Sequence, residues 1–204
     1  MNISERPTAE DTRARIMEVA WDLFRELGVR TTVADVAARL GMSSANIYRF
    51  FASKDALTEA ICRNLLDALI EAARAAASGP GDARTRLSAL LLTLHCNLRD
   101  QMTQEKRVHE VVAIALEEHW PPVHAFIETY EAMIAVVVAE GQASGEFGPG
   151  DPKALAEMVS AACVVIHHPT MIAECAAMKP QMAPEAVIGF ALRALANRNP
   201  PNLC

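Results

Sequence analysis

Apolar residues recur with helical rather than alternating spacing in every segment between the breaks of this chain. Long alternating runs rich in Val, Ile and Thr are missing from the sequence, and aromatic residues make up only 5% of it. The pattern predicts an all-α fold of about nine helices. The clearest apolar helix face belongs to the first segment and consists of Ile16, Val19, Ala20, Leu23, Phe24 and Leu27.

Capping residues, glycines and prolines set the expected helix ends. Thr8 and Asp11 resemble a capping box before the first helix, and Gly28 suits its C-terminus. Thr32 and Ser43 suit the N-caps of two very short helices. The helices expected after the first are about Val33–Leu40, Ser44–Phe50, 54–77, 83–100, 105–118, 122–144, 152–175 and 184–197.

Composition narrows the class of protein. The start of the chain is polar, and no apolar run reaches about 18 residues without a charge, so we expect neither a membrane span nor secretion. The cysteines are odd in number and contain no CxxC pair, which favours a reduced, cytoplasmic chain; they are Cys62, Cys96, Cys163, Cys175 and Cys204.

Charge is distributed unevenly along the sequence. The net charge is −6, but residues 1–54 carry eight Lys and Arg against seven Asp and Glu. The negative excess therefore lies in the rest of the chain. This asymmetry permits a local anion-binding surface at the N-terminus without requiring one.

Residues 31–51 are typical of a helix-turn-helix. Ala37 is the small residue that two steeply crossing helices need, and Gly41 suits a turn with positive φ. Ile47 would face the first of the two helices, which leaves small and hydrogen-bonding side chains and Arg49 on the outer face of the second. Such a face suits the major groove of DNA. The spacing alone also fits an ordinary αα-corner.

The flanking sequence resembles the TetR/AcrR family of regulators. The resemblance rests on YRFFASKDAL at 48–57, on FRELG at 24–28 and on the Thr31-Thr32 pair, and it covers about residues 10–60. It implies an all-helical homodimer with a helix-turn-helix DNA-binding domain, expected at 1–55, and a ligand-binding and dimerisation domain, expected at 56–204.

The resemblance also implies roles for single residues. Tyr48 and Lys54 match positions that commonly contact phosphates, Thr32 matches a cap that tends to face the DNA backbone, and Phe51 matches a core aromatic. Asn46 and Arg49 could read adenine and guanine edges. Ser44, Ala45 and Asn46 depart from the residues that many members carry, so the operator sequence stays open. The full expected DNA-contacting set is Thr32, Ser43, Ser44, Ala45, Asn46, Tyr48, Arg49 and Lys54.

Two C-terminal segments are expected to form the dimer interface. Segment 152–175 is apolar on most of its circumference, which requires burial on more than one side. Segment 184–197 has one apolar stripe, with Phe190 and Ala194 off it; the stripe is Val187, Ile188, Ala191, Leu192 and Leu195. Paired across a twofold axis, the two segments would make a four-helix bundle. A buried core within one chain is the alternative.

The middle segments are expected to enclose a cavity for an unknown small-molecule effector. The candidate lining residues are Cys96, Met102, His109, His124, Met133 and His167. The histidines, His168 among them, could bind a metal or an anion, but no HxxxH or ExxH pair stands among them, and structural or solvated histidines are the simpler interpretation. We therefore expect no metal and no cofactor.

These features favour a DNA-binding homodimer, most simply a repressor that a small molecule releases. Catalytic motifs such as GxSxG, GxGxxG, HExxH or a P-loop are missing from the sequence, so we expect no enzyme. The alternatives are a regulator of the same fold that activates or lacks a ligand switch, and a helical-bundle enzyme or metal-binding protein that uses the histidines.

Overall fold

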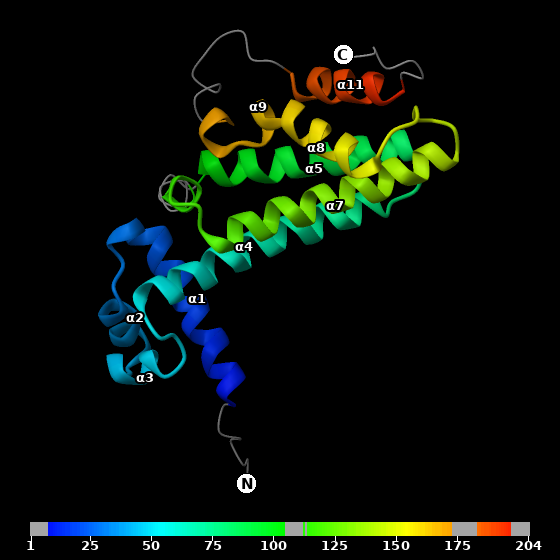
Figure 1. Cartoon of the computed structure of the whole chain (residues 1–204). Helices are drawn as coiled ribbons and strands as arrows, with labels where there is room; N and C mark the ends of the chain where they lie inside the picture. The colour runs from blue at the N-terminus through cyan, green and yellow to red at the C-terminus, as the bar shows by residue number, and fades with distance from the viewer. Residues whose placement is uncertain (1–7, 105–111, 113, 173–182, 197–204) are drawn as a thin grey trace. The chain divides into compact units, whose positions relative to one another are not determined.

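The computed structural model describes residues 8–104, 112, 114–172 and 183–196, and these residues confirm the all-α class. Most of the helix expected at 105–118 lies outside them. The described elements are α1 (Ala9–Leu27), η1 (Gly28–Arg30), α2 (Val33–Leu40), α3 (Ser44–Tyr48), α4 (Lys54–Ala77), α5 (Ala83–Gln104), α7 (Pro121–Ala143), α8 (Pro152–Ala162), α9 (Val164–His167) and α11 (Pro184–Leu195) (Figure 1).

The prediction of one continuous helix over 152–175 is wrong. α8 ends at Ala162, Cys163 with a ψ of 0° separates it from α9, and α9 ends at His167. His168 adopts an extended backbone, with φ −80° and ψ 123°, because it precedes Pro169.

The chain forms two compact units. One contains residues 1–65 and 105–122, and the other contains residues 66–104 and 123–204. The division falls inside α4, later than the boundary expected after residue 55. The reason is local packing: Leu57 and Ile61, on the first turns of α4, are buried in the core of the first unit.

The core of the first unit lies among α1, α2, α3 and the start of α4. Its buried side chains include Ile16, Phe24, Val36 and Ile47, and Trp120 packs against it as a partly buried neighbour. Trp120 follows a strained turn, since His119 has a φ of 54°. The first unit therefore includes a tryptophan that lies far along the chain from the helix-turn-helix.

In the second unit, α5 and α8 each pack against both α9 and α11 (Figure 1). Glu146 closes the start of α5: its carboxylate accepts hydrogen bonds from the backbone N–H groups of Ala83 (3.2 Å) and Arg84 (3.0 Å). These bonds and one from Ser144 lower the pKa of Glu146. The loop after α7 is thus fixed to the start of α5.

By length and composition, α7 could cross a membrane, with a mean hydropathy of 1.3 over the relevant window. One such helix is weak support for a membrane span, because core helices have the same composition. Tyr130, Ile134 and Val138 of α7 are buried in this structure.

Candidate nucleic-acid interface

The N-terminus of α2 is closed by a capping box between Thr32 and Asp35. The Thr32 hydroxyl accepts from the Asp35 N–H (3.2 Å), while the Asp35 carboxylate accepts from the Thr32 N–H (2.9 Å) and hydroxyl (2.6 Å). These bonds lower the pKa of Asp35. The Thr32 hydroxyl proton is therefore already engaged, so a phosphate at this end of α2 would meet the first-turn N–H groups more readily than this hydroxyl.

The turn between α2 and α3 has the geometry that the sequence predicts. Gly41 has φ 65° and ψ 31°, in the left-handed region, and the Met42 N–H donates to the Ala37 carbonyl at 2.9 Å. Ala37 is buried, and Ile47 on α3 is fully buried in the core of the unit. These contacts confirm a helix-turn-helix.

Burial of Ile47 leaves the other side chains of α3 at or near the surface. Ser43 caps the helix, its hydroxyl accepting from the Asn46 N–H at 3.3 Å. Ser44 and Asn46 are half-buried, while Ala45 and Arg49 are exposed. Tyr48, the last residue of α3, is 48% exposed. The outer face of α3 is thus small and polar, and ends in an aromatic and a cation.

Lys54 is exposed at the first residue of α4. The preceding Ser53 holds the start of the helix, since its hydroxyl accepts from the Ala56 N–H at 3.0 Å. All eight residues of the expected DNA-contacting set therefore belong to one compact unit. Their contacts with bases and phosphates remain predictions.

The residues expected to line an effector cavity differ in their burial. His109 and the Met102 side chain lie outside what the structure describes. His124 is exposed on α7, Met133 is buried and Cys96 is half-buried. Across the described ranges, no group of three His, Cys, Asp or Glu side chains could hold a metal ion.

His167 takes part in a buried hydrogen-bond chain. Its Nδ1 lies 3.0 Å from the Tyr130 hydroxyl and its Nε2 lies 2.9 Å from the Leu91 carbonyl. Close by, His95 Nδ1 lies 2.7 Å from the Ile166 carbonyl. Burial lowers the pKa of His167 to about 4. This arrangement favours a structural role for both histidines.

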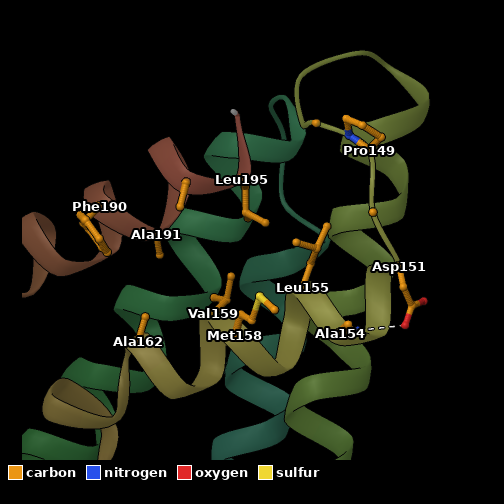
Figure 2. A pocket seen from close by; sticks show the side chains of 13 residues that line it. Pro149, Asp151, Ala154, Leu155, Met158, Val159, Ala162, Phe190, Ala191 and Leu195 are labelled. Carbon is orange, nitrogen blue, oxygen red and sulfur yellow. Dashed lines mark hydrogen bonds between the residues drawn. The ribbon is translucent and has the colours of Figure 1, made fainter. Parts of the chain in front are cut away.

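An apolar groove of about 560 Å³ lies on α8, α11 and the loop before α8 (Figure 2). Met158 and Phe190, which both line it, are 66% and 63% exposed. None of the six residues expected to line the effector cavity contributes to it. The lining consists of Gly148, Pro149, Gly150, Asp151, Ala154, Leu155, Met158, Val159, Ala162, Phe190, Ala191, Ala194 and Leu195.

Two models of known protein families match this chain. Residues 16–61 match the model described as bacterial regulatory proteins of the tetR family, and residues 83–188 match the tetracyclin repressor-like C-terminal domain. The chain belongs to the TetR family. The first match spans the helix-turn-helix and the start of α4, and the second spans α5 to α9 and the start of α11.

Individual relatives of this TetR-family protein support the assignment. The HTH-type transcriptional repressor KstR2 of Rhodococcus jostii is 36% identical over 94 residues, which cover 43% of this chain and 46% of that protein. KstR2 of Mycobacterium tuberculosis is 33% identical over 81 residues, which cover 39% of this chain and 40% of that protein. The chain thus spans less than half the length of the curated relatives it matches.

Solved structures share the fold over nearly the whole chain. A TetR/AcrR regulator from Thermobifida fusca has a TM-score of 0.61 at 26% identity, over 92% of this chain and 97% of that one. SmeT, described as the repressor of a multidrug efflux pump of Stenotrophomonas maltophilia, has a TM-score of 0.66 at 20% identity, over 93% and 96%.

Proposed function

We propose that this TetR-family protein is a cytoplasmic homodimer that binds operator DNA through α3 and represses transcription until a small-molecule effector releases it. The observation that carries the proposal is the asymmetry of α3. Ile47 is fully buried, whereas Ala45, Tyr48 and Arg49 are exposed next to the exposed Lys54. A helix anchored in this way can enter the major groove without disturbing its own core.

The exposed residues divide into two roles. Tyr48 and Lys54, at the end of α3 and the start of α4, would contact phosphates and fix the register of the protein on DNA. Asn46 and Arg49 would read base edges, for which amide and guanidinium groups have bidentate geometry. Ser44 and Ala45 are small enough to let the helix approach the bases.

The dimer would form through the groove on α8 and α11. Phe190 and Met158 stay exposed after α11 has buried Val187, Ile188 and Leu195. Large apolar side chains that one chain leaves exposed in the same groove are typical of a subunit interface. A dimer would also supply the two recognition helices that a twofold-symmetric operator requires, about 34–36 Å apart.

Release from DNA would be a population shift. An effector bound in the second unit would favour a conformer in which the two recognition helices no longer match successive major grooves. α4 is suited to transmit this change, because its first residues belong to one unit and its last residues to the other.

Salt titration of duplex binding by fluorescence anisotropy tests the proposal. Wild-type protein should show a log–log slope that reflects several neutralised phosphates. Lys54→Ala and Tyr48→Phe should weaken binding to all duplexes alike, whereas Arg49→Ala should cost about 1–3 kcal/mol on the operator and relax base preference. A flat slope for the wild type would contradict DNA binding.

A further inference from the structure

We infer that Arg13, on α1, is an additional phosphate contact of the DNA interface, outside the helix-turn-helix itself. The inference rests on the proposed function and adds a residue to it. It starts from one contact: the guanidinium carbon of Arg13 lies 4.6 Å from the centroid of the Phe51 ring. At this distance a cation is attracted to the face of an aromatic ring.

Phe51 fixes where this cation is held. The ring is buried, and its backbone N–H donates to the Ile47 carbonyl at 3.1 Å, so the residue is anchored to the end of α3. It lies in sequence between Tyr48 and Lys54, the two expected phosphate contacts. Arg13 is therefore held against the connection between α3 and α4, beside which α1 passes in Figure 1.

The contact with the ring leaves N–H donors of the guanidinium available. The ring attracts the group through its positive charge, while N–H donors that point away from the ring can bind a phosphate in a bidentate manner. The contact also limits the conformers of the long side chain before DNA arrives, which lowers the entropy lost on binding. The Arg13 side chain is exposed, so a phosphate can reach it.

The acidic groups around Arg13 do not neutralise it. Across the described residues, no Asp or Glu oxygen forms an ion pair with Arg13 within 4.0 Å. Glu10 and Asp11 lie in the same first turns of α1. The Asp11 carboxylate is turned back to the N-cap, where it accepts from the Thr8 N–H at 2.9 Å and from the Thr8 hydroxyl at 2.8 Å. The cation is thus left for an external anion.

Arg13→Ala and Arg15→Ala form a matched pair for the test. Both are exposed arginines on α1, but a two-residue offset turns Arg15 about 200° away from Arg13 around the helix. Binding to a random-sequence duplex is measured by anisotropy as a function of salt, with unfolding followed by circular dichroism. Arg13→Ala should weaken binding roughly tenfold near 0.1 M salt and reduce the slope by about one per chain. Arg15→Ala should change neither.

Arg13→Lys and Arg13→Gln extend the comparison. The lysine variant keeps the charge and should retain most of the salt slope. The glutamine variant loses the charge and should behave like the alanine variant. If the alanine variant is unfolded, the glutamine variant replaces it in the comparison. Equal binding and equal slopes for the Arg13→Ala, Arg13→Gln and Arg15→Ala variants would overturn the role of Arg13 while leaving DNA binding intact. A wild-type protein that binds no duplex would overturn both.

Discussion

The Tyr130 hydroxyl and His167 Nδ1 lie 3.0 Å apart in the interior of the second unit. The Leu91 carbonyl, 2.9 Å from Nε2 of the same ring, can only accept, so Nε2 must carry a proton. In the neutral ring Nδ1 is then the acceptor, and the Tyr130 hydroxyl donates to it. The hydrogen bonds thus determine both the tautomer of His167 and the direction of the Tyr130 bond.

The first prediction concerns pH. Burial lowers the pKa of His167 to about 4, below the ordinary value near 6.5. Between these values the unfolded chain binds the proton and the folded chain does not, so His167 makes stability fall as pH decreases through this window. From pH 7 to pH 5 the loss should be about 2 kcal/mol. Nitrogen-detected NMR should show the Nε2–H tautomer, and a ring that titrates near 6.5 would contradict it.

The second prediction uses the two tyrosines of the chain as a matched pair. Tyr130→Phe removes the donor to His167 and leaves a buried acceptor without a partner, at a cost of about 1–3 kcal/mol of unfolding free energy. Tyr48→Phe, on an exposed side chain, should leave stability within about 0.5 kcal/mol of the wild type. Chemical denaturation measures both, and equal stabilities would rule out the proposed bond.

The third prediction compares two helix ends of the same geometry. Gly41 and His119 both occupy left-handed backbone, and the residue after each donates to the carbonyl five positions earlier. Gly41→Ala should lose about 1 kcal/mol, purely from the backbone, because a Cβ there would meet nothing within 4 Å. His119→Gly should instead gain up to about 1 kcal/mol. Changes of the same sign in thermal unfolding would refute this account of the two turns.

The fourth prediction concerns the apolar groove. Phe190→Glu should convert the proposed dimer into monomers in analytical ultracentrifugation, since a charge cannot be buried there without a partner. Val136→Glu is the control, because Val136 is also exposed, at 59%, but lies on α7 and does not line the groove. A Phe190→Glu dimer as stable as the wild type would place the subunit interface elsewhere.

The sequence predicted the helix-turn-helix well because its signals are local. The capping box of Thr32, the left-handed turn at Gly41 and the burial of Ile47 each follow from the chemistry of a few neighbouring residues. The sequence also predicted the apolar stripe on α11 correctly: all five of its residues are buried.

Features that depend on distant contacts were less predictable. The break at Cys163 interrupts an apolar run whose periodicity continues on both sides, and nothing in the local pattern marks it. Packing of Trp120 on the first unit joins segments far apart in the chain. The cation–π contact between Arg13 and Phe51 has the same origin, because an exposed arginine on an amphipathic helix gives no sign of which ring it will contact.

Selection of bound duplexes from a random pool tests the central claim most directly. If the exposed face of α3 enters the major groove and two copies act together, the recovered sequences should share an inverted repeat. Its half-sites should lie about 10 base pairs or a small multiple of that apart. Recovery of no common sequence, together with binding that does not respond to salt, would contradict the account.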